Sequence, residues 1–337
     1  MVTLAHGAGG KAMRDLIEDV FLGAFTSPEL ARLEDQARLA FRDLAAHGDR
    51  LAFTTDSYVV DPLFFPGGDI GSLAVNGTVN DLAVGGARPL YLSCGFIIEE
   101  GFPIATLRQI ASSMGAAARA AGVSIVTGDT KVVGRGAADK LFINTAGVGV
   151  IPNGIEIGAD KARPGDVVLV SGPLGDHGAA ILAARGDLAI ELDLASDCRS
   201  LAGLAAAALS ACPDIRAMRD LTRGGLAATL NEFALASDVC IRVDEAALEL
   251  RPQVVGACEL LGLDPLYLAC EGALAAVVSA SAAEAALGAM RTDPAGGTAR
   301  VVGTVLEAPC GIVLLDTVFG GQRVVETLIG EQLPRIC

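Results

Sequence analysis

Four aspartates stand among small polar or glycine neighbours, a context typical of ligand sites. They are Asp56 in residues 54–57, Asp81 in 75–81, Asp129 in 127–130 and Asp220 in 219–225. A buried carboxylate is unfavourable unless it is paired or bound to a cation. Several converging carboxylates can hold one or two Mg²⁺ ions that bridge nucleotide phosphates. Each aspartate alone is better explained as a turn or helix cap, so the prediction of an ATP and Mg²⁺ site depends on all four together.

Two further charged residues are candidates for a role at the same site. Lys131 follows Asp129 by two residues on one predicted strand, so both side chains point to the same face. A lysine beside carboxylates that hold Mg²⁺ can stabilise phosphate charge, but a surface ion pair explains it equally well. Glu271 leads into an apolar strand, where a charged residue is often part of a site. An ordinary turn acid is an equally good explanation for Glu271.

A glycine-rich segment with one histidine opens the sequence. Residues 7–12 match G-x-G-x-x-A by letter, but no adequate strand precedes them and no acidic residue follows at the expected distance. The segment is not a P-loop, because Lys11 is followed by alanine. Such a backbone can still close over phosphates as a lid, so His6, Gly9 and Gly10 are kept as nucleotide-binding candidates. On this feature alone a disordered terminus is favoured. The other two histidines, His47 and His177, are each expected to be satisfied polar groups.

The last residue of the sequence, Cys337, differs from the other seven cysteines. No CxxC pair is present, and most cysteines are expected to be buried small hydrophobic residues. The seven residues after Gly330 span roughly 23–25 Å when extended, enough to carry a thiol from the surface into a cleft. A thiolate is a strong nucleophile and a fair leaving group. We therefore expect Cys337 to carry an acyl-like group, with an accidental exposed thiol as the alternative.

Strands and helices are expected to bring these residues together. Hydrophobic patterning predicts helices at 11–25, 70–86, 103–121, 176–185, 198–210, 222–236 and 281–290, and strands at 51–56, 90–98, 123–129, 141–150, 166–171, 239–243, 273–279 and 300–315. A turn-rich segment at 151–165 predicts a domain boundary near residue 155. Asp56 and Asp129 end predicted strands, whereas Asp81 falls in a polar patch of an apolar helix. The fold class that follows is α+β.

Composition excludes several classes of protein. The net charge of −15 and the lack of a Lys/Arg cluster argue against nucleic acid as a partner. No uninterrupted apolar stretch approaches the roughly 18 residues of a membrane span, and no basic region with an apolar core opens the sequence. Three histidines and no CxxC pair make a zinc site of sequence-local ligands unexpected. We expect a cytoplasmic enzyme.

Seven segments together resemble the HypE family of hydrogenase maturation proteins, within the PurM-like superfamily. They are residues 6–10, 55–62, 65–69, 76–81, 127–131, 220–225 and 334–337. The most specific is Pro334–Cys337, since the related ATP-binding enzymes PurM, SelD and ThiL lack it. The resemblance implies a PurM-like fold, with an ATP-binding and dimerisation domain at 1–155, a second domain at 156–329 and a mobile tail at 330–337.

The resemblance also implies a reaction and its partners. HypF places a carbamoyl group on the terminal cysteine, ATP drives its dehydration to a thiocyanate, and the cyanide passes to iron on the HypC–HypD complex. Cys337 is then the carrier and Glu271 the candidate base, assisted by Lys131. The expected nucleotide site comprises His6, Gly9, Gly10, Asp56, Asn76, Asp81, Asp129, Thr130, Asp220 and Arg223. Its expected metal ligands are Asp56, Asp81, Asp129 and Asp220.

Two other functions remain open from the sequence. The chain could be a PurM-like ATP-dependent synthetase or kinase that acts on a free small molecule, in which case it would keep its activity without Cys337. It could also be a non-catalytic carrier or scaffold that presents its thiol to an iron-assembly partner. Such a carrier would not couple ATP hydrolysis to its tail.

Overall fold

The N-terminal half is built on a mixed four-stranded sheet, in a computed structural model that describes residues 1–186, 192–328, 330 and 333–337. The strand order is β1 (Arg50–Tyr58), β6 (Leu141–Ile151), β4 (Arg88–Glu99) and β5 (Ser124–Val133). Only the β4–β5 pair is parallel. Alternate residues of β4 are buried, which is the period of two that predicted the strand. β1 and β5 are therefore the two edge strands.

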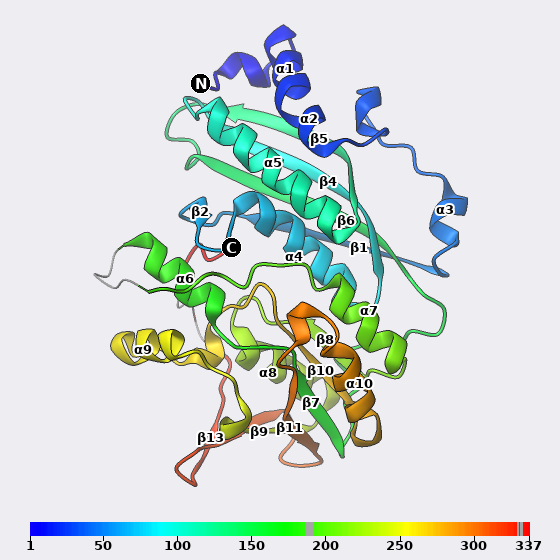
Figure 1. Cartoon of the computed structure of the whole chain (residues 1–337), viewed down its shortest axis with the longest axis vertical. Coiled ribbons are helices and arrows are strands. Elements are labelled where there is room, and N and C mark those ends of the chain that lie inside the picture. Colours follow the sequence, from blue (N-terminus) through cyan, green and yellow to red (C-terminus); the bar gives the residue numbers. More distant parts are fainter. Residues whose placement is uncertain (187–191, 329, 331–332) are drawn as a thin grey trace.

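Helices α4 (Ile70–Val84) and α5 (Ile104–Ala121) cover one face of this sheet (Figure 1). Asp69 caps α4 by accepting the backbone N–H groups of Gly71 and Ser72. Almost the whole of α4 is buried, and Gly77 allows the close packing, since a Cβ there would lie 2.3 Å from the Tyr58 hydroxyl oxygen. The large apolar side chains of Phe53 and Ile97 remain exposed on this sheet.

Residues 4–45 form an N-terminal helical segment that contacts α5, β5 and β6. It comprises η1 (Leu4–Gly7), α1 (Lys11–Leu16), the π-helical turn η2 (Ile17–Leu22), α2 (Gly23–Phe25), η3 (Leu30–Arg32) and α3 (Phe41–Ala45). Phe21 contacts Phe96 of β4, with the ring centroids 4.7 Å apart. The helix predicted at 11–25 is thus present as one helical path, with a π turn in its centre.

A seven-stranded sheet forms the core of the C-terminal half. Its order is β13 (Gln322–Val324), β12 (Ile312–Asp316), β9 (Cys240–Asp244), β11 (Arg300–Leu306), β7 (Asp166–Val170), β10 (Leu274–Ser279) and β8 (Ala217–Asp220). Its helices are α6 (Asp176–Arg185), α7 (Ala202–Ala211), α8 (Gly225–Ser237), α9 (Pro252–Leu261) and α10 (Ala283–Met290). The strand predicted at 300–315 is two strands, because a turn with Pro309 and Gly311 divides it. The described part is completed by η4 (Glu245–Ala247), η5 (Pro265–Tyr267), η6 (Ala280–Ala282), η7 (Pro294–Gly296), β2 (Phe64–Phe65) and β3 (Gly68–Asp69).

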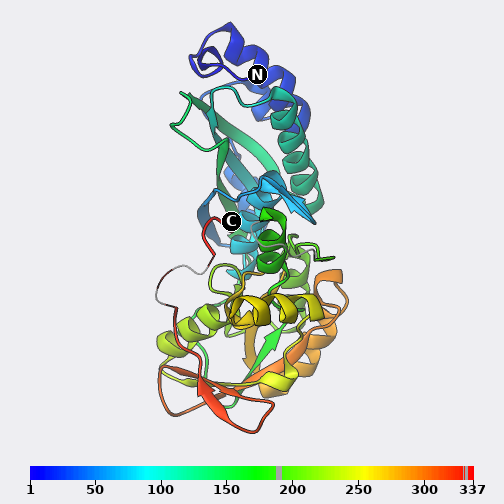
Figure 2. The ribbon, with the colours of Figure 1, turned by 90° about the vertical axis from the view of Figure 1, so that its left-hand side faces the viewer.

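The two halves are stacked along the long axis and meet at α4 (Figures 1 and 2). Asn80 of α4 is buried, and its Nδ2 donates to the carbonyl oxygen of Arg199 at 3.0 Å. Its Oδ1 accepts the backbone N–H of Leu201 at 2.7 Å. Asn80 thus faces the second half of the molecule, which explains why polar residues occur in this otherwise apolar helix. None of the helices in the described ranges has the length and apolar character of a membrane span.

Candidate active site

Four acidic side chains from four elements influence one another where the two halves join. Asp56 lies on β1, Asp81 in α4, Asp220 at the end of β8 and Glu271 in the turn before β10. The Thr54 hydroxyl donates to Oδ2 of Asp81 at 2.8 Å. Three of the four aspartates that were predicted to share a site therefore influence one another, and Glu271 lies with them.

Burial and mutual repulsion disfavour the charged forms of these acids. Burial, with the charge of Asp56, raises the pKa of Asp81 to about 6. Burial, with the charges of Asp81 and Asp56, raises the pKa of Asp220 to about 7. For Glu271, burial and then Asp220 raise the pKa well above its ordinary value. The cluster can therefore bind a cation or hold a proton near neutral pH.

A buried loop fixes the position of Glu271. Asp197 accepts the backbone N–H of Glu271 at 2.9 Å through Oδ1 and that of Gly272 at 3.0 Å through Oδ2. Nδ2 of Asn80 also donates to the carbonyl oxygen of Glu271, at 3.4 Å. The Glu271 side chain is 3% exposed, and its buried Oε1 has no hydrogen-bond partner in the described residues. Such an orphaned buried oxygen is costly, which suggests that a ligand uses it.

The donor set suits a hard cation, although the protein atoms do not form a complete cage. Across the described ranges no group of three or more His, Cys, Asp or Glu side chains is arranged to hold a metal ion by itself. Mg²⁺ is usually bound by one or two carboxylates together with substrate phosphates and water, so a complete protein cage is not required. Burial, and then the charges of neighbouring carboxylates, raise the pKa values of Asp81 and Asp220, and a cation would offset both effects.

The C-terminal tail returns to the N-terminal sheet and ends beside β1. The backbone N–H of Val59 donates to the carbonyl oxygen of Cys337 at 3.0 Å, and that of Asp61 donates to Arg335 at 3.3 Å. The Arg335 side chain donates to the Val59 carbonyl oxygen at 2.9 Å and pairs with Asp139 at 2.5 Å. Cys337 is half-buried. The tail is therefore docked, three residues along the chain from the cluster aspartate on β1.

Helix α6 holds the same tail from a different side. Nε2 of His177 lies 2.8 Å from the carbonyl oxygen of Ile336, and Nδ1 lies 2.8 Å from the Ser196 hydroxyl. A carbonyl only accepts, so Nε2 carries the hydrogen. Burial lowers the pKa of His177 to about 4, which keeps the ring neutral near pH 7. The guanidinium of Arg185 donates to the two carbonyl groups upstream of Ile336.

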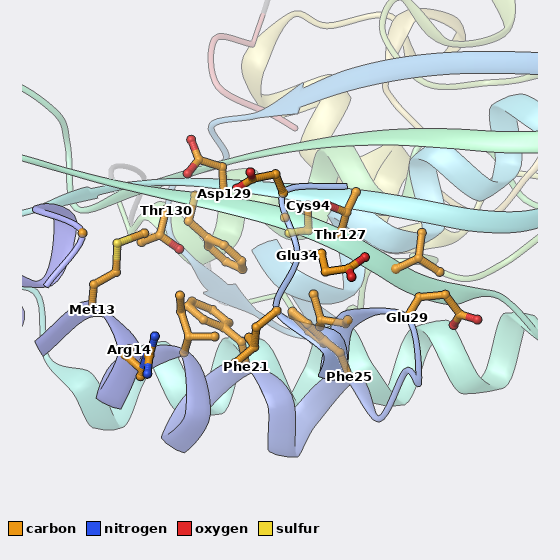
Figure 3. Close-up of a pocket in the computed structure, with 18 of the residues that line it drawn as sticks. Met13, Arg14, Phe21, Phe25, Glu29, Glu34, Cys94, Thr127, Asp129 and Thr130 are labelled. Atoms are coloured by element: carbon orange, nitrogen blue, oxygen red, sulfur yellow. The ribbon is translucent and has the colours of Figure 1, made fainter. Parts of the chain in front are cut away.

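A second site is the cavity of about 700 Å³ between the N-terminal helices and strands β4 and β5 (Figure 3). Its apolar wall includes Phe21, Phe25 and Phe96, whereas Gly9, Gly10, Asp129 and Thr130 line other parts of it. Figure 3 shows Asp129 and Thr130 on the strand side and the labelled phenylalanines on the helix side. A cavity with aromatic walls and a few polar groups is typical of small-molecule sites.

The remaining predicted residues do not all lie at the acidic cluster. Lys131 forms an ion pair with Asp129 at 3.6 Å, and both side chains are largely exposed. They lie on edge strand β5, three strand spacings, about 14 Å, from edge strand β1. The structure thus separates Asp129 and Lys131 from the acidic cluster within one chain. His6 lies at the surface, where its ring nitrogen Nδ1 is 2.9 Å from the Thr3 hydroxyl.

Two candidates lie near the tail and the cluster. Asn76 of α4 is buried, and its Nδ2 lies 3.7 Å from Sγ of Cys198. Arg223 lines a cavity of about 420 Å³ together with Ile336 of the tail. Sequence reasoning missed His177, Arg185 and Asp197, because their partners in the tail and in the Glu271 loop lie 74 to 159 residues away.

Comparisons with known proteins assign the chain to a family. It matches the models "AIR synthase related protein, N-terminal domain" over residues 34–151 and "AIR synthase related protein, C-terminal domain" over residues 163–315. It is similar to the carbamoyl dehydratase HypE of Rhodobacter capsulatus, with 62% identity over 336 residues that cover 100% of this chain and 98% of that protein.

Solved structures give the same assignment. A crystal structure of the hydrogenase maturation protein HypE in complex with ATP matches with a TM-score of 0.95 and 50% identity, and covers 100% of both chains. A crystal structure of a HypE–HypF complex matches with a TM-score of 0.80 and 44% identity, over 93% of this chain and 99% of that one. The predicted PurM-like α+β fold is confirmed.

Proposed function

This chain belongs to the HypE family of carbamoyl dehydratases, and we propose that it uses ATP to dehydrate an S-carbamoyl group on Cys337 to a thiocyanate. In hydrogenase maturation this product supplies the cyanide ligand for the iron of [NiFe]-hydrogenase. The observation that carries the assignment of Cys337 is its docking: its carbonyl oxygen accepts the N–H of Val59, at the end of the strand that carries Asp56. This docking supports the proposal, because Val59 is three residues along the chain from Asp56 of the acidic cluster.

The reaction requires a better leaving group and a base. A carboxamide oxygen leaves poorly, and transfer of the ATP γ-phosphoryl group to that oxygen converts it to a phosphate leaving group. A base then removes the N–H protons as the C≡N bond forms. Glu271 is our candidate for this base, because its burial and the neighbouring acids raise its affinity for a proton. Lys131 remains a candidate assistant.

Asp56, Asp81 and Asp220 are the residues that would hold Mg²⁺. The ion would neutralise charge on the transferred phosphoryl group. It would also offset the burial and the mutual repulsion that raise the pKa values of Asp81 and Asp220. Asp129 was predicted as a fourth ligand, and it can join them only from a second copy of the chain or after a rearrangement.

We assign the nucleoside part of ATP to the cavity of about 700 Å³. Phe21, Phe25 and Phe96 offer an apolar surface for a base, and Gly9 and Gly10 at its mouth leave room for phosphates. His6, Asn76, Thr130 and Arg223 remain candidates for further contacts. The neighbouring Asp129 can accept hydrogen bonds from a ribose.

A homodimer could bring the nucleotide cavity of one copy close to the acidic cluster of the other. The nucleotide cavity lies at edge strand β5 and the acidic cluster at the other edge, β1, and both edges are unpaired in the described chain. Phe53 is 73% exposed and Ile97 is 45% exposed on the sheet. An exposed apolar sheet is a typical interaction surface. A two-fold pairing through it would bring Asp129 and Lys131 of one copy towards the cluster of the other.

The partners and compartment follow from the same assignment. A family member has been crystallised with HypF, which we propose as the carbamoyl donor, with the HypC–HypD complex as cyanide acceptor. We place the protein in the cytoplasm, because cysteines such as Cys94, Cys212 and Cys258 carry thiols without a disulfide. The domain boundary proposed near residue 155 falls between β6 and β7.

The test is to carbamoylate the chain, add Mg-ATP and record the intact mass with the ADP formed. We expect one ADP for each tail that loses the mass of one water. A Cys337→Ala variant should retain ATP binding but show no ADP burst. An equal ATPase rate in that variant would instead support a kinase or synthetase that acts on a free small molecule.

A further inference from the structure

The docked tail lies in a groove that the rest of the chain builds. This tail groove consists of Val59, Asp61, Asp139, His177 and Arg185, which come from the end of β1, the loop before β6 and helix α6. Nε of Arg185 also donates to the carbonyl oxygen of Asp61 at 3.0 Å, so the two walls are joined to each other. The groove therefore has internal contacts that do not depend on the tail.

The groove contacts the main-chain carbonyl groups of the last four residues. Each carbonyl oxygen of residues 334–337 accepts a hydrogen bond, from Arg185, from Asp61 and Arg185, from His177 and from Val59 in that order. Four consecutive satisfied carbonyl groups are a peptide-recognition pattern, because main-chain hydrogen bonds supply affinity and fix the register.

Two side chains of the tail add specificity. The Arg335 guanidinium pairs with Asp139 and donates to a backbone carbonyl of β1's end, whereas the Ile336 side chain is 4% exposed in the N-terminal core. Arg335 also has φ of 54°, a left-handed conformation that costs roughly 1 kcal/mol for a non-glycine residue. A free peptide rarely adopts it, so the groove imposes the conformation.

From these contacts we propose that the tail groove is a self-contained binding site for a Pro-Arg-Ile-Cys peptide, and that the chain binds and dehydrates such an S-carbamoyl peptide from a separate molecule. The inference rests on the proposed function for its chemistry but not for its binding. Covalent attachment then contributes only effective concentration.

His177 is the positioning residue of this site. Its Nε2–H holds the carbonyl group of the peptide bond that precedes the reactive cysteine, and Ser196 and the edge of the Phe65 ring hold the imidazole in turn. The ring centroids of Phe65 and His177 are 5.5 Å apart. Cys337 follows this peptide bond directly, so a displacement of the Ile336 carbonyl group also displaces the thiol.

The flank of the groove leaves room for exchange. The cavity of about 420 Å³ is lined by Ile336 and Leu333 of the tail and by Arg223, Tyr267 and Ala269 of the body. Figure 2 shows the last residues at the side of the molecule, between its two halves. A separate peptide can therefore reach the groove when the native tail leaves.

Dehydration of the separate S-carbamoyl peptide balances with ATP as its only co-reactant. The C–O bond of the peptide thiocarbamate breaks, its oxygen leaves with the γ-phosphoryl group as inorganic phosphate, and ADP is released. Nitrogen loses two protons to the base and the solvent while the C≡N bond forms. The sulfur–carbon bond is retained, and nothing is oxidised or reduced.

The catalytic experiment uses the full chain with Cys337→Ser, whose own tail cannot be carbamoylated. Millimolar S-carbamoyl acetyl-Leu-Pro-Arg-Ile-Cys is added with Mg-ATP, and the peptide mass is followed. We expect conversion to the thiocyanate, and at least about five-fold faster conversion when Arg335→Glu, which repels Asp139, also releases the native tail. A peptide with Asp in place of Ile should not react.

The binding experiment starts from the unaltered chain and needs no dehydration step. Acetyl-Leu-Pro-Arg-Ile-Ser should displace the native tail and raise the alkylation rate of Cys337, whereas the Ile-to-Asp peptide should not. His177→Leu should raise that rate without peptide, and His177→Gln, whose Nε2–H₂ can still donate, should restore the slow rate. A general loss of fold would affect both variants alike, which thermal unfolding checks.

The outcomes separate the two proposals. If the carbamoylated native tail is dehydrated but the peptide neither displaces it nor reacts, the tail groove is not a self-contained site. If the peptide displaces the tail and no thiocarbamate of either kind is converted, the binding site stands and the dehydratase assignment fails.

Discussion

The carboxylate of Asp197 accepts the backbone N–H of Glu271 at 2.9 Å, and so fixes the loop that presents the candidate base. The same carboxylate accepts the next N–H, of Gly272, at 3.0 Å. Asp197 is buried, and its charge is among the causes that raise the pKa of Glu271. Asp197 thereby influences both the position and the proton affinity of Glu271.

Asp197→Asn is expected to slow dehydration by about ten-fold or more, because one of the two backbone contacts is lost and the base moves. Removal of the charge should also lower the pKa of Glu271, so the rising limb of the pH–rate profile should move to lower pH. Single-turnover rates across pH measure both effects. The exposed Asp193→Asn is the control, and an unshifted profile in Asp197→Asn would contradict the coupling.

Glu271→Gln is expected to reduce dehydration by at least about 100-fold while ATP binding is retained. It should also raise the melting temperature at mildly alkaline pH, since a buried carboxylate among three aspartates is replaced by a neutral group. Lower activity with higher stability is the signature of a functional buried charge. A variant that dehydrates the carbamoylated tail at the normal rate would exclude Glu271 as the base.

The stability of the ligand-free chain should fall as pH rises from about 4 to about 7 relative to Asp220→Asn. The folded pKa of Asp220, about 7, lies above its unfolded value, so the folded state holds the proton longer and loses stability as that proton leaves. The difference is on the order of 3 kcal/mol.

Urea unfolding at several pH values measures this difference, with the exposed Asp214→Asn as control. His177, whose pKa is lowered to about 4, has the opposite effect below its unfolded value and is common to all three chains. The contribution of His177 to the pH dependence of stability therefore cancels in the comparison. A pH-independent difference would show that Asp220 is not desolvated in solution.

Phe53→Asp is expected to convert a dimer to a monomer, because it places a charge on the exposed apolar sheet of the N-terminal half. If Asp129 and Lys131 act across copies, the dehydration rate should fall with the dimer. Light scattering and single-turnover rates report the two effects. Phe319→Asp, at a more exposed position of the C-terminal half, is the control that should change neither.

Local patterns predicted most of the elements that carry the site. The alternation in residues 90–98 and 141–150 corresponds to β4 and β6, and five of the cysteines are buried as expected. Helix α9 was missed although Pro252 at its start and Gly262 at its end are ordinary helix signals.

The relative positions of residues that are distant in the sequence could not be predicted from local patterns. Asp56 and Asp129 were both predicted to end strands, but β1 continues to Tyr58 and β5 to Val133, and only the sheet order puts the two aspartates on opposite edges. His177 was expected to be a satisfied polar group, and it is, but its partner is a tail carbonyl 159 residues away. No local spacing encodes that contact, so the tail groove emerges only from the fold.

The most direct test of the account follows the carbamoyl oxygen. The chain is charged on Cys337 with a carbamoyl group that carries heavy oxygen, and Mg-ATP is added for a single turnover. We predict that the label appears in inorganic phosphate, in the same amount as ADP, while the tail becomes a thiocyanate. Label that stays on the tail or enters solvent water would contradict phosphoryl transfer to that oxygen.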